Sequence, residues 1–486
     1  MTIDGEVARG ELEAALARVL EVVEAWRAHP ERAPLLRAAP EVLERFRQPS
    51  PLPSDGEPLA DAIEAMIAAV AAGYCNASHR HYHAYFAARV RMEAVIGDLF
   101  GAALNQTPAA WRAGPGVSAI EAETLAWIAD LVGYGRGRGR GSWPGGVVVG
   151  GGHLANLVAL KLARDRALGP AIQEEGLAGA PPLRVYMSRE GHFSIPRALD
   201  LLGLGRRALR TIATDAAGRM DPEALAAAID EDVAAGVRPL AVVAIAGTSG
   251  TGAIDPLAAI AEVAEARGIF FHVDGAAGAA MGTLEGVGER LRGIERADAV
   301  TLDPCKWLFV PYGIGVLLTR DGDALARAFP SSSHYWEELE EPDLFHQGPY
   351  GSRQVRTLGL WLLLRRLGRA GMHRLLGGLV ARARELAARV EASPALELLG
   401  PPETAIVALR ARHPGSDAAA RSALNRRIQR LLLARDQAHV TCLEWAGEVW
   451  LRVGMINYTL ETGDVDRLVA AIVECRAIAL SEETGL

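Results

Sequence analysis

The sequence is poor in cysteine and in basic charge. The four cysteines are Cys75, Cys305, Cys442 and Cys475. They are widely spaced and none forms a CxxC pair, which argues against a disulfide framework or a zinc ribbon. Lys and Arg total 51 against 59 Asp and Glu. The resulting net charge of −8 disfavours a nucleic-acid partner, because binding to phosphates calls for a basic surface.

Long apolar runs are also absent. No stretch of about 18 uncharged apolar residues suits a membrane span. The first residues lack the basic and apolar regions of a secretory signal. We therefore expect a cytoplasmic protein with no membrane partner. Aromatic residues make up only 6% of the chain, so any flat stacking partner must come from few positions.

What is present is enough apolar sequence for a large core. The chain has 486 residues, half of them apolar, which excludes disorder and suggests two or three domains. Helical spacing of apolar residues predicts helices within residues 7–48 and again over 59–72. Residues 49–58, rich in Pro and Ser, separate them as a linker.

Seven short apolar runs follow, mostly separated by helix-length spacers. They indicate an open α/β sheet with helices on both faces. The last two are joined only by a loop, which is compatible with an antiparallel pair. From about residue 355 the chain is helical again, and a smaller α+β portion closes it with strand-like segments at 405–409 and 449–453. The seven runs are 147–149, 183–187, 209–213, 240–246, 269–273, 299–302 and 314–318.

Two polar segments interrupt this pattern. Residues 133–146 alternate Arg and Gly, which fits either a surface loop or an RNA-binding segment, and the acidic chain favours the loop. Residues 329–351 form a long segment rich in Ser, Glu and Pro, and such segments are often lids or disordered.

The end of the first strand carries three glycines, Gly150 to Gly152, followed by a helix. Glycines let backbone N–H groups approach an anion, and a helix N-terminus favours negative charge. A phosphate cradle and a plain tight turn fit this segment equally well, because it has neither a P-loop lysine nor GxGxxG spacing.

Three further candidates follow strand ends, where ligands bind in open α/β sheets. Asp274 ends an apolar strand and needs a partner, either a helix cap or ion pair, or a cationic ring nitrogen. Lys306 lies in an apolar stretch, either as a snorkelling lysine or as a Schiff-base nucleophile. His192 precedes a helix and has either a structural or a catalytic role. Together with the glycines they suit a phosphorylated pyridine aldehyde, which needs a phosphate site, a carboxylate and an amine.

With these motifs the sequence resembles the group II amino-acid decarboxylases, which depend on pyridoxal 5'-phosphate (PLP) and include aromatic-L-amino-acid decarboxylase. The likeness covers about 80% of the chain, in the family's order. It is carried by HRHYHAYFA (79–87), WRAGPGVSAIEAE (111–123), GGGHLANLVAL (150–160), REGHFSIPRAL (189–199), IAGTSGTGAIDP (245–256), HVDGAAG (272–278), LDPCKW (302–307), SRQVRTLGLW (352–361) and LRVGMINYT (451–459).

The resemblance implies a fold-type I architecture like that of aspartate aminotransferase. We expect a helical N-terminal arm (1–85), a large PLP-binding domain with a seven-stranded, mostly parallel sheet (86–375) and a small α+β C-terminal domain (376–486). It also implies a homodimer in which a mobile loop, here about 329–351, covers the neighbouring site.

Roles carry over from the family position by position. The resemblance makes Lys306 the Schiff-base lysine, Asp274 the partner of the pyridine nitrogen, and His192 the residue that stacks on the ring and moves protons. The remaining cofactor contacts fall on Gly151, Gly152, His153, Ala276, Cys305 and Ser352. Substrate contacts fall on Tyr85, Phe86, Trp111, Leu344, Phe345 and Arg356.

The chain departs from the family at five places. Ile245 and Ala88 stand where the family commonly has Thr. His153 stands where Ser or Thr is usual, and Cys305 where His is common. Aromatic decarboxylases carry a loop tyrosine that returns a proton after CO2 leaves, whereas Leu344 aligns there, with Phe345 beside it. Tyr335 and Tyr350 lie in the same loop but are offset from that position.

The leading hypothesis is PLP-dependent decarboxylation of an L-amino acid, aromatic or specialised, by Schiff-base and quinonoid chemistry. An alternative is oxygen-using decarboxylation and deamination to an aldehyde, since family members without the loop tyrosine include aldehyde synthases. A catalytically silent binding subunit is a third hypothesis, which Lys306 and Asp274 argue against. The missing family residues suggest secondary metabolism. Alternating His79, His81 and His83 could suggest a metal site, but we expect none, because the resemblance makes this segment a substrate-side wall.

Overall fold

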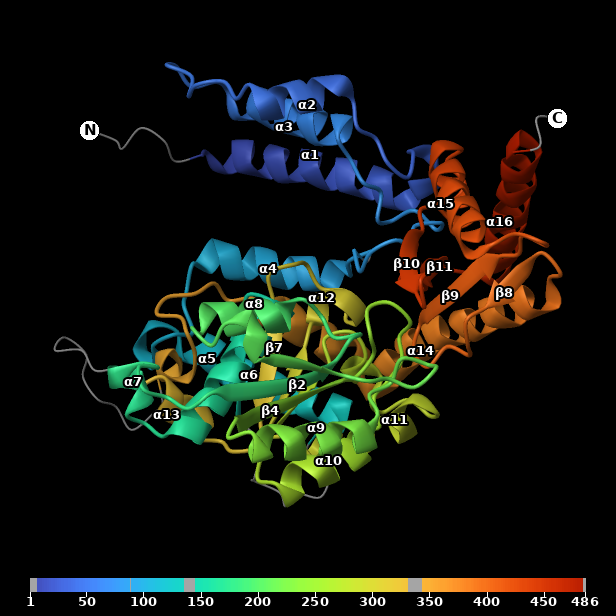
Figure 1. The fold of residues 1–486 in the computed structure, drawn as a ribbon. Coiled ribbons are helices and arrows are strands. Elements are labelled where there is room, and N and C mark those ends of the chain that lie inside the picture. Colours follow the sequence, from blue (N-terminus) through green and yellow to red (C-terminus); the bar gives the residue numbers. More distant parts are fainter. Residues whose placement is uncertain (1–6, 88, 135–144, 331–342, 484–486) are drawn as a thin grey trace.

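The computed structural model describes residues 7–87, 89–134, 145–330 and 343–483. Most of the Arg-Gly segment and much of the expected mobile loop, including Tyr335, lie outside these ranges. Figure 1 shows a large α/β body, a layer of N-terminal helices above it and a smaller α+β unit at one side. No helix in the described ranges is long and apolar enough to span a membrane.

The large sheet has seven strands in the order β1-β7-β6-β5-β4-β2-β3. β2, β3, β4, β5 and β6 are parallel, whereas β7 runs antiparallel to both of its neighbours. The expected sheet and the antiparallel last pair are thus confirmed. The strands are β1 (Gly145–Val149), β2 (Leu183–Ser188), β3 (Leu209–Ile212), β4 (Arg238–Ile245), β5 (Phe270–Asp274), β6 (Ala299–Leu302) and β7 (Gly315–Thr319).

Helices cover both faces of this sheet because successive strand residues point to opposite sides. On β4, Val243 packs with α6 and α8, while Val242 and Ala244 pack in the core that includes α9 and α10. The helices of the body are α4 (Met92–Leu104), α5 (Pro115–Val132), α6 (Gly152–Leu168), α7 (Ile172–Glu175), α8 (Ser194–Leu201), α9 (Pro222–Ala234), α10 (Leu257–Ala266), α11 (Val287–Arg290), α12 (Pro304–Trp307) and α13 (Ala324–Ala328).

Short 3-10 helices mark several of the connections. η2 (Trp111–Ala113) precedes α5, and η6 (Leu344–Gln347) follows the segment that the structure leaves undescribed. The others are η1 (Pro30–Arg32), η3 (Arg206–Ala208), η4 (Ala279–Met281) and η5 (Ile294–Arg296).

The N-terminal helices are α1 (Arg9–Ala28), α2 (Pro40–Arg47) and α3 (Leu59–Ala72), as the periodicity predicts. Several large apolar side chains on these helices are exposed to solvent. Leu12, Leu16 and Leu20 form an exposed row on α1, and Met66 and Val70 are exposed on α3.

A long helix, α14 (Thr357–Ala392), connects the body to the small unit. Its backbone is interrupted at Gly368, which has φ +60° and ψ 179°. The expected boundary at residue 375 lies inside this helix and stays a prediction. Near its start, α14 packs so closely on α4 that a Cβ on Gly97 would lie 2.6 Å from Gly359 Cα.

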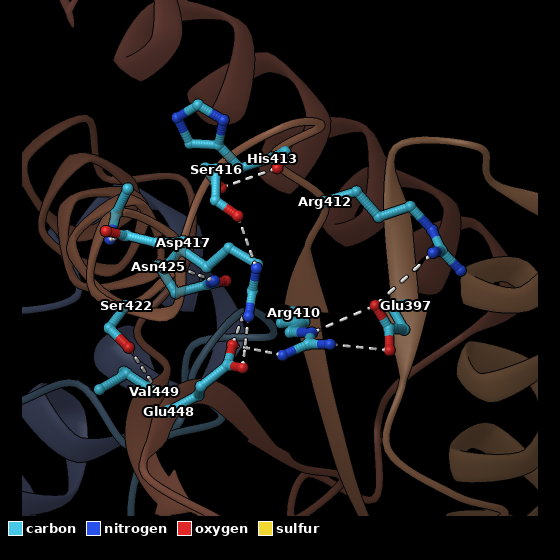
Figure 2. Close-up of polar contacts among 12 residues, drawn as sticks. Glu397, Arg410, Arg412, His413, Ser416, Asp417, Ser422, Asn425, Glu448 and Val449 are labelled. Carbon is cyan, nitrogen blue, oxygen red and sulfur yellow. Dashed lines mark hydrogen bonds and ion pairs between the residues drawn. The ribbon is translucent and has the colours of Figure 1, made fainter.

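The small unit is a four-stranded antiparallel sheet, in the order β10-β11-β9-β8, covered by two helices. Its elements are β8 (Leu396–Leu398), β9 (Ile406–Ala411), α15 (Ala418–Ala434), β10 (Thr441–Trp445), β11 (Glu448–Gly454) and α16 (Thr462–Glu483). An ion-pair cluster ties β11 to β9 and α15, since Glu448 pairs with both Arg410 and Arg421 (Figure 2).

Candidate active site

A small polar cavity opens where the parallel strands end. Its walls come from the segments that follow β1, β2, β4, β5 and β6, because the carboxyl ends of parallel strands meet at one edge of a sheet. The lining residues are Gly152, His153, Asn156, Glu190, His192, Ile245, Gly247, Ser249, Asp274, Ala276, Ala277, Asp303 and Lys306.

The glycine turn between β1 and α6 forms one end of the cavity. Gly151 has φ +132°, a conformation that favours glycine, and it caps the N-terminus of α6. A Cβ on Gly152 would lie 3.2 Å from Asp303 Oδ2. The glycine therefore leaves this end of the cavity free of a side chain. The N–H of Gly150 donates to the Tyr350 hydroxyl at 3.1 Å. The turn therefore presents a helix N-terminus, which favours anions, to the cavity.

Asp274 ends β5 and is only 4% exposed. Its Oδ2 accepts a hydrogen bond from Asn156 Nδ2 at 2.8 Å, and its Oδ1 accepts the N–H of Ala276 at 3.2 Å. Asn156 Nδ2 also lies 2.9 Å from Ser194 Oγ. Two hydrogen bonds therefore fix the Asp274 carboxylate at the cavity, and neither of them is an ion pair.

Lys306 lies in α12, directly after β6, and its side chain is 16% exposed. Its Nζ is 3.9 Å from Asp303 Oδ2 and 4.9 Å from the centre of the Phe86 ring. Next to it, the Cys305 thiol donates to Asp303 Oδ1 at 3.0 Å. Burial raises the pKa of Cys305, so this residue is a protonated thiol rather than a reactive thiolate.

His192 lies between β2 and α8, half-buried at the cavity wall. Its Nδ1 accepts the N–H of Ser194 at 3.2 Å, and its ring lies 4.0 Å from the Phe193 ring, centre to centre. Burial lowers the pKa of His192, and the Lys306 ammonium lowers it further, while the Asp274 carboxylate opposes both. The imidazole is therefore neutral at neutral pH and carries its proton on Nε2.

The structure brings together most of the residues that the sequence assigns to the cofactor. Lys306, Asp274, His192, Gly152, His153 and Ala276 all line the cavity. Gly151 and Cys305 are their chain neighbours. Ser352 is exposed and lies outside the lining.

The expected substrate residues are more scattered. Phe86 lies beside Lys306, but the other five are not part of the lining: Tyr85, Trp111, Leu344, Phe345 and Arg356. Tyr85 is largely exposed, and Arg356 pairs with Asp98 at 3.1 Å. Asp343 accepts the N–H of Trp111, and the N–H of Phe345 donates to Ala109. In a single chain, these five side chains do not line the cavity.

The alternating histidines show no sign of a metal centre. The rings of His79 and His81 lie 5.7 Å apart and those of His81 and His83 lie 6.4 Å apart, centre to centre. Burial lowers the pKa of all three. Within the described ranges, no group of three or more His, Cys, Asp or Glu residues could hold a metal ion.

Several residues at the site escape prediction from the sequence. Asn156, Glu190 and Asp303 line the cavity. Arg452 is buried beside Phe86 and donates hydrogen bonds to the backbone oxygens of Ser249 and Ala84. Burial lowers its pKa to about 10. One available signal was composition: the whole sequence has only two lysines, Lys161 and Lys306, so a lysine at a strand end stands out.

These residues fit pyridoxal phosphate. The open glycine approach and the start of α6 suit the phosphate, and the lysine amine suits the aldehyde. The buried carboxylate suits a protonated ring nitrogen. Ala276 leaves room for a flat ring. When bound, the cofactor supplies an electron sink for the carbanion left by a departing carboxylate.

The sheet and its cavity together define a PLP-dependent enzyme of fold-type I. Comparison with known proteins narrows this class. Residues 40–412 match the model described as the pyridoxal-dependent decarboxylase conserved domain. The chain belongs to this family.

Relatives agree with this assignment. The chain is 30% identical over 419 residues to an aromatic-L-amino-acid decarboxylase of Bacillus atrophaeus, covering 85% of this chain and 83% of that protein. It is 27% identical to a phenylacetaldehyde synthase of Arabidopsis thaliana, covering 74% of each. It superposes on the crystal structure of an Oryza sativa TDC with PLP and tryptamine with a TM-score of 0.90 and 26% identity, covering 97% of this chain and 99% of that one.

The chain is therefore a PLP-dependent carboxy-lyase that decarboxylates an L-amino acid. The fold-type I architecture, the enzyme class and the cofactor expected from the sequence are confirmed, and the silent-subunit hypothesis is set aside.

Proposed function

We propose that decarboxylation at this site uses Lys306, Asp274 and His192. The observation that carries the proposal is their convergence, from three different strand ends, in one cavity beside the start of α6. The three residues are far apart in the sequence, and only the fold brings them together.

The three residues divide the work. The Lys306 amine would hold the cofactor through its aldehyde. Asp274 accepts a hydrogen bond from the protonated ring nitrogen, a charge-assisted contact of about 1.5–3 kcal/mol. His192, neutral and carrying its proton on Nε2, covers the ring and moves protons near the substrate. Gly151, Gly152 and His153 hold the phosphate.

The family relation and two exposed surfaces support a homodimer. Rows of apolar side chains are exposed on α1 and α3, and Ile96, Leu99 and Phe100 are exposed on α4. Five of the six expected substrate residues do not reach the cavity within one chain, and only Phe86 lies beside Lys306. A second chain that covers α4 would complete both sites. We also propose a cytoplasmic location and a specialised substrate. His153, in the glycine turn where the family usually has Ser or Thr, supports the specialised substrate.

One observation favours the aldehyde as an alternative product. In the described part of the chain, no tyrosine lines the cavity, and the loop position expected to supply one holds Leu344. Without that proton donor, the carbanion formed by loss of CO2 persists and is open to oxygen. The Arabidopsis relative, whose name states an aldehyde product, supports this alternative.

A substrate panel tests the proposal. Purified enzyme with PLP is given aromatic, acidic and diamino L-amino acids, while CO2, amine, oxygen uptake and peroxide are measured. We expect CO2 and amine in equal amounts with no oxygen uptake. Oxygen consumed in proportion to CO2 would exclude simple decarboxylation and support the aldehyde. Release of CO2 that persists in Lys306→Ala would contradict the proposed site.

A further inference from the structure

Behind Asp274 lies a buried polar chain that the reaction, as described above, does not use. Asn156 on α6 bonds Asp274 through its Nδ2, and its Oδ1 lies 2.9 Å from His272 Nε2. The other ring nitrogen, His272 Nδ1, lies 3.1 Å from the backbone oxygen of Ala299 on β6. His272 is fully buried. It precedes Asp274 by two residues on β5, so both side chains lie on the same face of the sheet.

The direction of each hydrogen bond follows from the partners. An ionised Asp274 only accepts hydrogen bonds, so the amide NH2 of Asn156 must face it. The amide oxygen of Asn156 then faces His272 Nε2, and this oxygen also only accepts. On the other side of the ring, the Ala299 oxygen is a third acceptor. Both ring nitrogens of His272 must therefore carry hydrogen.

A doubly protonated imidazole is a cation, and its charge has a partner. Burial lowers the pKa of His272, whereas the Asp274 carboxylate and the Ala299 oxygen raise it. Asp274 is the one charged group that acts on His272 in the described ranges. A neutral ring would leave one unprotonated ring nitrogen facing an oxygen that can only accept, at hydrogen-bond distance and with no hydrogen between them. The hydrogen-bond pattern therefore favours the cation over the effect of burial.

We propose that His272 and Asn156 are positioning residues for Asp274: the His272 imidazolium is its counter-charge, and the Asn156 amide links the two. The pair keeps Asp274 ionised and fixes Oδ2, leaving the carboxylate ready for a protonated ring nitrogen before the cofactor arrives. The inference rests on the role proposed for Asp274 and extends it to two residues that do not touch the cofactor's reacting atoms.

The first test measures protonation directly, without cofactor. The histidines are labelled with 15N, and the ring nitrogens of His272 are assigned by their loss in His272→Gln. We expect both to be protonated at neutral pH. His83 is the matched control, since it is equally buried but only its Nδ1 has a partner, the Gly454 oxygen, within the described residues. Burial lowers its pKa to about 3, and it should be neutral. An unprotonated Nε2 on His272 at neutral pH would overturn the proposal.

The second test separates the charge from the hydrogen bond. His272→Gln keeps a donor for Asn156 without the charge, and Asn156→Leu breaks the link. We expect each to raise the Kd for PLP about tenfold or more, the size typical when support behind a ligand-binding group is lost. Circular dichroism and thermal melting of the apoproteins confirm that the variants fold. PLP binding by His272→Gln as tight as in the wild type would overturn the counter-charge.

A third variant distinguishes this inference from the role of Asp274 itself. If Asp274→Asn binds PLP as tightly as the wild type, the proposed contact with the ring nitrogen is wrong. A doubly protonated His272 in the wild type would still support the charge pair. If Asp274→Asn loses PLP while His272→Gln keeps it, Asp274 holds the cofactor unaided, and the positioning role is wrong.

Discussion

At the scale of single residues, the proposed role of Lys306 as the lysine that binds the cofactor can be tested by replacing it. Lys306→Ala should lose the absorbance near 420 nm expected of PLP joined to lysine. Because no other amine lies in the cavity lining, it should also lower CO2 release at least about a thousandfold. Borohydride reduction and peptide mass spectrometry should place the cofactor on Lys306 in the wild type.

The second lysine is a matched control. Lys161 pairs with Asp165 at 2.5 Å, on the helix that begins at the cavity. Lys161→Ala should keep the absorbance band and the activity. Cofactor found on Lys161 in the wild type would reject the assignment of Lys306.

His192 sets an acid limit on activity. Burial lowers its pKa below the ordinary value near 6.5, so the ring is neutral above that point and becomes charged as the pH falls through it. Protonation removes the Nδ1 acceptor used by Ser194 and brings a cation to the cofactor. We expect kcat/KM for CO2 release to hold steady near neutral pH and to fall as the pH drops below the ordinary histidine pKa of about 6.5.

The variant His192→Gln should lower activity and remove this acid limb, because glutamine does not titrate in that range. A profile with an unchanged acid limb would show that a group other than His192 controls it.

The sequence identified residues that carry a reactive group at a strand end. Lys306, Asp274 and His192 each have a chemistry that their local surroundings make unusual. Asn156 and Arg452 do not, because each acts only through residues far away in the chain: Asn156 through Asp274 and His272, Arg452 through Ala84 and Ser249. Such partners become visible only after the sheet has formed.

At the scale of elements, the contact between α4 and α14 depends on glycine. A Cβ on Gly359 would lie 2.5 Å from the backbone oxygen of Ala94 and 2.7 Å from Asp98 Oδ1. Gly359→Ala should therefore push the helices apart and lower the free energy of unfolding by about 1–3 kcal/mol. Urea denaturation followed by circular dichroism measures this change.

Gly378, farther along the same helix, is the control. A Cβ there meets nothing within 4 Å. Gly378→Ala should be neutral, or stabilising by up to about 1 kcal/mol through helix propensity. Equal destabilisation by both substitutions would show that loss of glycine, rather than the helix contact, is responsible.

Elements were predictable where apolar periodicity was strong. The seven runs of the large sheet and the helix over 59–72 match the structure closely. The short edge strands β8 and β10 were not predicted. β8 is only three residues long, and β10 has no fully buried residue, so neither leaves a clear alternation of buried and exposed positions.

At the scale of the whole molecule, the exposed apolar surface predicts assembly. We expect the purified protein to show a mass twice the 51.6 kDa of one chain by light scattering. Phe100 is 58% exposed on α4 between other exposed apolar residues. Phe100→Asp should place a charge in the proposed contact and produce monomer. It should also lower activity, because most of the expected substrate residues do not line the cavity of a single chain.

Leu52, in the linker before α3, is 94% exposed and provides the control. Leu52→Asp should leave both mass and activity unchanged. A wild-type protein that is monomeric and fully active would reject the dimer.

The placement of the two lysines has a consequence for handling the protein. Both side chains are less than one-fifth exposed, with Lys161 held by Asp165 and by the backbone oxygen of Ala328 and Lys306 inside the cavity. Ordinary proteins offer many lysine amines to acylating dyes and crosslinkers, whereas this one offers almost none while folded. Its lysines become reactive when α6 or the cavity opens, so acylation at these two positions records local unfolding.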